Sequence, residues 1–197
     1  NHAGQHSTAF ESEVLVALSK QGCNSGACHG SPSGKGGFRL SLRAFDKKLD
    51  ELTLIREDFG RRINPVQPER SLLLLKPTMG VEHGGGKRLR TDDHAYETLY
   101  RWISAGANAD PADAARCDRL EVFPNQKRVL SVSDGDQQLA ATAQFSDGSA
   151  RDVTQAVAYS SSNTDVATVD KNGFVSAHTQ GETVILVRFL EHIEAIP

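Results

Sequence analysis

The sequence predicts a protein of the α + β multidomain class, in which an all-α domain is followed by an all-β sandwich. Apolar residues recur at helical spacing within the first 110 residues, as in the series Phe10, Val14, Leu15 and Leu18. Beyond residue 118, short stretches that alternate apolar and polar side chains are separated by turn residues. The segment 111–117 is small and polar and contains Pro111, which is typical of a linker. We therefore expect domains at 1–110 and 118–197, joined by a linker at 111–117.

Composition limits the classes of function. The 197 residues are 38% hydrophobic and 24% charged, and no apolar run approaches the roughly 18 residues that a membrane-spanning helix needs. Lys and Arg number 16 against 14 acidic residues in 1–117, and 6 against 11 in 118–197. Neither part has the dense basic stripe that nucleic-acid binding requires. We expect no membrane span in this sequence and no nucleic-acid partner.

Four helical segments are expected in the first domain. The first covers about residues 9–20, where Thr8 and Glu11 fit a capping box and Gly22 follows the last turn. The second and third cover about 49–55 and the enclosed leucine run at 71–76. The fourth begins near Asp92, with a buried stripe made of Tyr96, Leu99, Tyr100, Trp102 and Ile103. Residues 38–42 alternate, as in a short strand or an extended run, and His2 and His6 precede the first helix in a polar arm that we expect to be solvated.

The stretch 23–29 carries the chemistry of this domain. It reads Cys-x4-Cys-His, and it resembles a widened form of the Cys-x-x-Cys-His signature by which c-type cytochromes hold haem. The thiols of Cys23 and Cys28 would form thioethers with the two haem vinyl groups, and His29 would be the proximal iron ligand. The two extra residues must bulge from the loop, for which Gly26 provides room. A zinc site, an iron–sulfur site and an unliganded pair of cysteines are the alternatives.

Further candidate residues follow in the chain. Arg61 and Arg62 could pair with haem propionates, because a guanidinium binds a carboxylate through two hydrogen bonds. Met79, the only methionine, and His83, which is followed by three glycines, are candidates for the distal iron ligand. The run Gly-Gly-Gly-Lys at 84–87 lacks the spacing of a phosphate-binding loop.

The order of these segments resembles the planctomycete-type cytochrome c domain over about residues 8–107. The resemblance rests on the Cys-x4-Cys-His loop, on NPVQPERSLLLLKPT at 64–78, and on the helix that ends in Trp102-Ile103-Ser104-Ala105-Gly106-Ala107. It implies a distal ligand from a Met-Pro sequence about 17 to 20 residues before the tryptophan of the closing helix. His83 lies 19 residues before Trp102, and Met79 lies 23 residues before it. The Met-Pro pattern is absent here. The resemblance therefore favours His83, with Met79 as the alternative.

The second part resembles bacterial immunoglobulin-like domains of group 2 over about residues 118–197. The resemblance rests on SSSNTDVATVDKNGFVSA at 160–177 and on the Gly-x-Thr-Val-Ile strand that follows, with Tyr159 where that family often has a tryptophan. It implies an antiparallel sandwich that serves as a spacer or docking module. Cys117, left over in the linker, is expected to be a half-buried free thiol, with an intermolecular disulfide or a metal ligand as the alternatives. His178 and His192, on or near strands of this domain, are not expected to bind the haem.

Together these features predict a c-type cytochrome that carries one covalently attached haem c with two axial histidines. Its expected role is one-electron transfer with an unidentified redox partner, as part of a larger exported protein whose location is periplasmic or at the cell surface. No nucleophile–base pair or carboxylate pair is apparent, so we expect no catalytic site of its own. Two alternatives remain: a haem-based sensor or peroxidase-like module that regulates a catalytic domain outside this sequence, and a cell-surface binding module with a structural zinc site.

Overall fold

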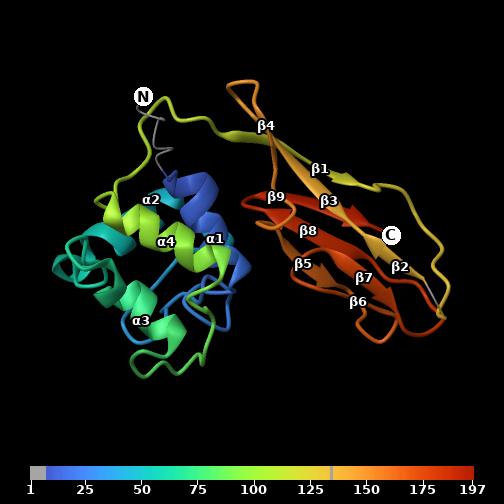
Figure 1. Cartoon of the computed structure of the whole chain (residues 1–197), viewed down its shortest axis with the longest axis horizontal. Helices are drawn as coiled ribbons and strands as arrows, with labels where there is room; N and C mark the ends of the chain where they lie inside the picture. The colour runs from blue at the N-terminus through green and yellow to red at the C-terminus, as the bar shows by residue number, and fades with distance from the viewer. Residues whose placement is uncertain (1–7, 134) are drawn as a thin grey trace. The chain divides into compact units, whose positions relative to one another are not determined.

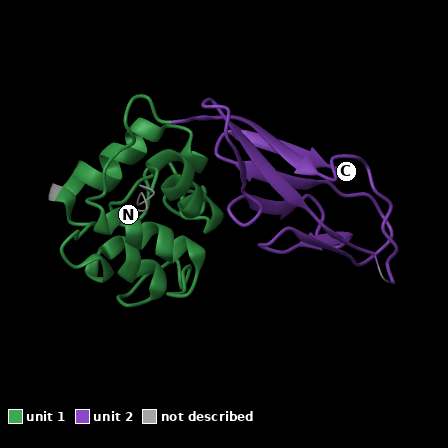
Figure 2. Ribbon diagram, turned by 45° about the horizontal axis from the view of Figure 1, so that its top comes forward, with its two compact units in different colours: residues 1–114 green, residues 115–197 purple. Residues whose placement is uncertain are grey.

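The computed structural model describes residues 8–133 and 135–197, so His2 and His6 lie outside the described residues. The chain divides into two compact units, Asn1–Ala114 and Ala115–Pro197 (Figure 2). Among the described residues, no helix is both long enough and apolar enough to cross a membrane.

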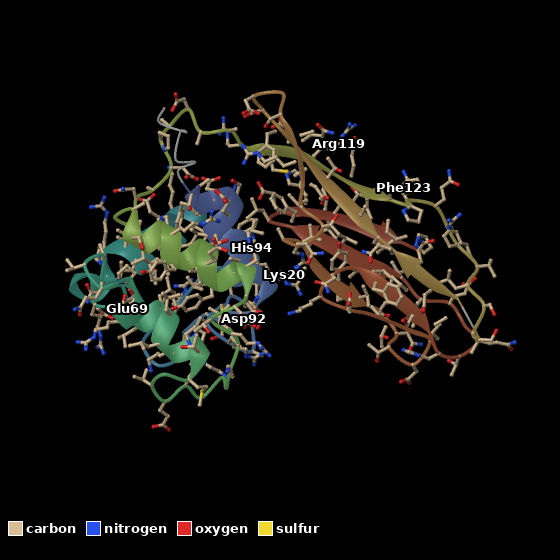
Figure 3. All side chains as sticks on the ribbon, in the orientation of Figure 1. Lys20, Glu69, Asp92, His94, Arg119 and Phe123 are labelled. Atoms are coloured by element: carbon tan, nitrogen blue, oxygen red, sulfur yellow. The ribbon has the colours of Figure 1, made fainter. Side chains whose placement is uncertain are left out.

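The first unit is built from short helices joined by irregular segments (Figure 1). A π-helical turn, Phe10–Leu15, continues directly into α1, Val16–Lys20, so the helix expected at about 9–20 is present. It is followed by α2, Lys47–Glu51, which continues as the π-helical segment Leu52–Arg56. The last two are α3, Leu72–Thr78, and α4, His94–Ser104, and Figure 3 places His94 at the start of α4. Short 3₁₀ turns cover Leu42–Ala44, Glu57–Gly60 and Pro68–Arg70.

The expected capping box at the first helix is wrong. The backbone amides of Phe10 and Glu11 donate instead to the carboxylate of Asp110, at 2.6 and 2.8 Å, and Ala9 N–H donates to Glu13. Glu11 forms an ion pair with Lys47, 3.0 Å away. A carboxylate at a helix N-terminus satisfies free amides and favours the helix dipole, so Asp110 takes the role expected of Thr8.

A core of aromatic and aliphatic side chains joins the first helix to α4. The rings of Phe10 and Trp102 lie with centres 5.6 Å apart, and both side chains are fully buried. Trp102 Nε1 donates to the carbonyl of Asn108, 2.8 Å away, which satisfies the polar end of the indole. Leu99 and Ile103 complete the buried face of α4, whereas Tyr100, which was expected in that stripe, is exposed. The difference follows from the helical period, since Tyr100 lies two residues from Trp102 and so faces away from it.

The segment at 38–42 does not form a strand. It makes one isolated bridge between Lys35 and Phe38 and then runs extended into the 3₁₀ turn at Leu42–Ala44. Leu40 N–H donates to the carbonyl of His29, 2.8 Å away. The extended run is therefore attached to the segment that carries the cysteines and His29.

Among its described residues, the second unit contains three antiparallel sheets of three strands each. Figure 1 shows these strands. In sheet order, the first holds β1 (Cys117–Phe123), β3 (Ala140–Phe145) and β4 (Ala150–Asp152). The second holds β2 (Asp136–Gln138), β7 (Phe174–Ala177) and β6 (Ala167–Val169). The third holds β5 (Ala158–Ser161), β8 (Ile185–Phe189) and β9 (His192–Ile196).

The core of this unit follows from alternation along its strands. Every second residue of β3 and β8 is buried, as expected for strands that face a core on one side. Phe145 and Phe189, from two different sheets, meet edge-to-face with ring centres 6.5 Å apart. The Asn172–Gly173 turn, with Gly173 at φ 86°, connects β6 to β7 as the sequence indicated. At the far end of β1, Phe123 is exposed (Figure 3).

Candidate functional site

A cavity of about 540 Å³ lies in the first unit, within the range of about 300–1,000 Å³ that is usual for small-molecule sites. Its walls come from the end of α1, the segment after it, α3 and the loop that precedes α4. The apolar lining includes Leu18, Phe38, Leu72, Leu73, Leu89 and Leu99. Both cysteines of the Cys-x4-Cys-His stretch also line it, together with His29 and His83. With Arg61 and Arg62, which also line it, six of the residues that the sequence singled out therefore meet at one cavity.

The cysteine loop is held by its own backbone. Cys23 N–H donates to the Leu18 carbonyl at 3.0 Å, which ties the loop to the end of α1, and His29 N–H closes it by donating to the Cys23 carbonyl at 2.9 Å. A side chain on Gly30 would place Cβ 2.0 Å from the carbonyl oxygen of Asn24, so only glycine fits there. Gly26, which was expected to make room for the two extra residues, has an ordinary φ, and a Cβ there would meet only Leu42 Cδ1, at 4.0 Å. The tight position of this loop is therefore Gly30.

The two imidazole rings line the same cavity. The ring centres of His29 and His83 are 6.2 Å apart and the ring planes differ by 14°. Two metal–nitrogen bonds of about 2.0 Å, each extended by about 1.1 Å from nitrogen to ring centre, would separate two imidazoles on opposite sides of one metal by about 6.2 Å. The observed separation of the ring centres matches that distance, and both rings line the same cavity.

Hydrogen bonds fix which nitrogen of each ring is available. His29 Nδ1 lies 3.0 Å from the Phe38 carbonyl, and His83 Nδ1 lies 2.8 Å from the Gly86 carbonyl. Since a carbonyl only accepts, each Nδ1 must donate, and a neutral ring then carries its lone pair on Nε2. A backbone carbonyl that holds the second nitrogen is the usual support of a metal-binding histidine.

The environment favours neutral imidazole at His29. Burial lowers the pKa of His29, and the neighbouring His83 ring lowers it further, while the Phe38 carbonyl acts in the opposite direction. Phe38 also contacts the ring directly, with ring centres 4.6 Å apart. Neutral imidazole is the form that binds metals.

Neither cysteine beside the cavity is paired in a disulfide. Burial and the neighbouring Cys28 raise the pKa of the Cys23 thiol to about 12, so Cys23 is a protonated thiol near neutral pH. Catalytic cysteines need the opposite, a lowered pKa that yields thiolate. Among residues 8–133 and 135–197, no group of three or more His, Cys, Asp or Glu side chains is arranged to hold a metal ion together.

The two arginines named from the sequence differ in their surroundings. Arg62 is buried, and its guanidinium donates to the carbonyls of Thr53 and Gly37 and to the Asp58 carboxylate, at 3.1, 3.0 and 2.8 Å. Its charge is thus engaged within the protein, where it also lies over the Phe38 ring at 4.8 Å. Arg61 is exposed and lines the cavity.

Three further cations line the cavity and were not singled out from the sequence: Lys35, Lys76 and Arg88. Arg88 is directed by a hydrogen bond from its Nε to the Gly85 carbonyl, 2.9 Å away. Isolated basic residues in a polar loop carry no pattern that distinguishes them from solvated charges, so the sequence held no signal for these three. With Arg61 they leave the lining rich in positive charge, which suits a ligand that carries carboxylates.

The other candidate ligands lie elsewhere. Met79 follows α3 with φ 66°, is 47% exposed and does not line the cavity. Three residues named from the sequence belong to the second unit and are engaged there. His192 Nε2 lies 3.0 Å from the Cys117 carbonyl, and His178 Nε2 lies 2.7 Å from the Thr168 hydroxyl.

Comparisons with known proteins place one family match on numbered residues of this chain, and these lie in the second unit. Residues 121–187 match the family model described as "Bacterial Ig-like domain (group 2)", so the expected immunoglobulin-like sandwich in this part of the chain is confirmed. A segment of 57 residues, 28% of this chain, is 44% identical to Ice-binding protein 1 of Shewanella frigidimarina (strain NCIMB 400), of whose length it spans 6%. The crystal structure of the S-layer protein rSbsC(31-844) aligns over 47% of this chain and 17% of that one, with 17% identity and a TM-score of 0.35. The sequence from 121 to 187 is thus similar to the bacterial immunoglobulin-like domains of group 2.

Proposed function

We propose that the first unit is a c-type cytochrome module that binds one haem c and transfers single electrons. The observation that carries this proposal is the pair of nearly parallel imidazoles, His29 and His83, with ring centres 6.2 Å apart in a cavity that two cysteines also line. In this proposal Cys23 and Cys28 hold the haem as thioethers, and His29 and His83 are its axial ligands. When bound, the haem supplies a one-electron Fe(III)/Fe(II) couple.

The residues of the chain would position the group and limit its contact with water. The carbonyls of Phe38 and Gly86 orient the two imidazoles through their Nδ1 atoms. The leucines from α1, α3 and α4 supply an apolar wall, which lowers the dielectric around the iron. Arg61 and Arg88 are the candidates to receive propionates, because the guanidinium of Arg62 is already engaged.

The location of the protein and the role of its second unit follow from the same proposal. Haem c attachment and the immunoglobulin-like unit both suit an exported protein, in the periplasm or at the cell surface. The second unit would act as a spacer or docking module for a larger redox protein. In this proposal both His29 and His83 would bind the iron, which favours electron transfer over the sensor or peroxidase-like alternative, because that alternative needs a displaceable ligand.

The test is covalent attachment. The chain should be produced in cells able to attach haem c, and its mass and acid–acetone extraction measured. We expect the mass of one additional haem and pigment that remains with the denatured protein. Cys23→Ala combined with Cys28→Ala should release all pigment into the organic phase, whereas Cys117→Ala, the matched control in the second unit, should retain it. Complete extraction from the unsubstituted protein would overturn the proposal.

A further inference from the structure

An exposed apolar turn beside the cysteine loop has no role in the proposed haem site. Leu42 is 51% exposed and Phe45 is 87% exposed, and they lie at the two ends of the same 3₁₀ turn. Leu42 also reaches the loop itself, since its Cδ1 is 4.0 Å from the position that a Cβ on Gly26 would occupy. Gly26 and Ala27 are exposed as well. We call Gly26, Ala27, Leu42 and Phe45 the Leu42–Phe45 patch.

The patch is held in a strained conformation. Arg43 and Ala44, between the two apolar residues, have φ of 56° and 60°, which side chains other than glycine rarely adopt. Arg43 N–H donates to the Asn24 carbonyl at 3.0 Å, so the turn is fixed to the cysteine loop. Strained backbone persists where the surroundings enforce it, and it concentrates at functional sites.

A buried polar pair braces the turn from the other side. The backbone amide and hydroxyl of Ser41 both donate to the buried carboxylate of Asp50, each at 2.6 Å. The Ser41 hydroxyl in turn accepts from the amide of Asp46, 3.0 Å away, just beyond Phe45. Both ends of the turn are therefore anchored. A fixed turn presents its aromatic side chain at little entropic cost on binding, as a pre-organised contact surface does.

Three basic residues lie close to this patch in the chain. Arg39 and Arg43 flank Leu42 in the chain, and Lys48 follows Phe45 in the first turn of α2. All three are exposed, and none of them is held in an ion pair with another described residue. Asp46 is the exposed acid within the same stretch, and its carboxylate accepts from the Leu49 amide. An apolar centre with a cationic rim is complementary to a surface that has an apolar centre and an acidic rim.

We infer that the Leu42–Phe45 patch is the docking surface for an acidic one-electron redox protein. The inference rests on the proposed haem function, because the patch adjoins the loop of Cys23 and Cys28, which would be bonded to the haem. A partner seated on Leu42 and Phe45 is therefore brought close to the redox centre. Arg39, Arg43 and Lys48 steer it there, and the apolar residues set the lifetime of the complex.

The experiment measures the rate of haem reduction in the haem-loaded chain. The probe is reduced flavodoxin, an acidic one-electron donor, at low and high salt. Arg39→Glu combined with Lys48→Glu should lower the second-order rate constant about tenfold or more at low salt and have little effect at high salt. Leu42→Ser combined with Phe45→Ser should lower it about fivefold at both salt concentrations. The matched controls are Val66→Ser, at an 89% exposed valine of the same unit, and Arg70→Glu, and both should react as the unsubstituted chain does.

Several outcomes separate the two proposals. The rate of haem reduction by dithionite should be equal in all variants, and this equality would show that the haem is intact in each of them. If the patch variants then reacted with flavodoxin at the rate of the controls, the docking inference would be overturned while the haem proposal stood. A chain without haem would show no absorbance change with either reductant, which is a failure of the haem proposal alone. Loss of binding to phosphatidylglycerol vesicles, or loss of a dimer in sedimentation, without a change in the flavodoxin rate would identify the patch as a lipid-binding or self-association surface and overturn the inference.

Discussion

The carboxylate of Asp110 caps the helix that begins at Phe10, although the two residues are 100 positions apart in the sequence. Asp110 accepts from the amides of Phe10 and Glu11, and the helix so capped continues through α1 to the cysteine loop. The end of the first unit thus stabilises its beginning.

We expect Asp110→Ala to lower the free energy of unfolding of the first unit by about 1–2 kcal/mol, since two helix amides lose their acceptor and the helix dipole loses its anion. Urea unfolding followed by helical circular dichroism measures this change. Asp113→Ala, at an exposed carboxylate of the adjoining segment, should change the free energy by less than about 0.5 kcal/mol. Equal effects of the two substitutions would show that the observed hydrogen bonds contribute nothing to stability.

The true cap could not be predicted from the sequence, and the reason is physical. Thr8 and Glu11 have the residue types and spacing of a capping box, which is a local pattern. Asp110 reaches the same amides through tertiary structure, and the sequence near it carries no sign of that contact. The helix at Phe10–Lys20 was predictable because its apolar spacing reflects burial of one face, which the surrounding fold requires.

Gly85, which has no Cβ, leaves room for the ring of His83. A Cβ on Gly85 would lie 2.9 Å from Cε1 and 3.2 Å from Nε2 of His83, whereas a Cβ on Gly84 would meet no atom within 4 Å, and neither glycine has a left-handed φ. Gly85→Ala should therefore displace the imidazole and raise the high-spin fraction of the oxidised haem protein. Gly84→Ala should leave the spectrum unchanged. Optical and paramagnetic resonance spectra of the two variants make the comparison, and matching spectra would mean that the ring accommodates the methyl group without moving.

The cysteine loop offers a second matched pair of glycines. In Gly30→Ala the new Cβ would lie 2.0 Å from the backbone carbonyl oxygen of Asn24. Because a backbone atom cannot move aside as a flexible side chain can, the loop must open. Gly26→Ala meets only Leu42 Cδ1 at 4.0 Å, an ordinary contact. We expect Gly30→Ala to abolish most haem attachment and Gly26→Ala to retain it, as measured by haem absorbance per mole of chain. Normal attachment in Gly30→Ala would contradict the described loop.

Burial of Asp50 gives the first unit a pH dependence. Burial raises the pKa of the Asp50 carboxyl, against the opposing effect of the two hydrogen bonds from Ser41. Because the folded pKa exceeds the unfolded value, which is about 3.9, the folded state holds this proton more tightly. The associated stability is fully present below the unfolded pKa and is lost as the pH rises through the folded pKa.

The unsubstituted protein should therefore lose stability relative to Asp50→Asn as the pH rises above the unfolded pKa, about 3.9, and through the raised folded pKa. Other carboxylates titrate alike in both chains, so the difference between their free energies of unfolding isolates Asp50. Urea unfolding at a series of pH values measures that difference. Asp113→Asn serves as the control and should show no such trend, and a constant difference for Asp50→Asn would refute the assignment.

The parts of the candidate site differ in how far the sequence predicts them. Cys23, Cys28 and His29 form one local motif, and their spacing predicts haem attachment. His83 was favoured by its distance from Trp102, and the structure brings it to the same cavity as His29. The carbonyls that orient both rings come from Phe38 and Gly86. Every residue has a carbonyl, so no residue type marks those two positions, and only the folded chain shows which ones face the rings.

The choice between His83 and Met79 yields the last prediction. His83 lines the cavity, with its ring centre 6.2 Å from that of His29, whereas Met79 is exposed and does not line it. His83→Ala should therefore open one coordination position, producing a high-spin spectrum and rapid binding of carbon monoxide by the reduced protein. Met79→Leu should leave the oxidised protein low-spin and slow to bind carbon monoxide. A pair of histidine ligands also gives a lower reduction potential than histidine with methionine in a comparable pocket. Met79→Leu should therefore leave the reduction potential of the protein unchanged. The opposite pattern, a site opened by Met79→Leu and left closed by His83→Ala, would require the 79–89 loop to rearrange when haem binds and would make the protein a higher-potential electron carrier.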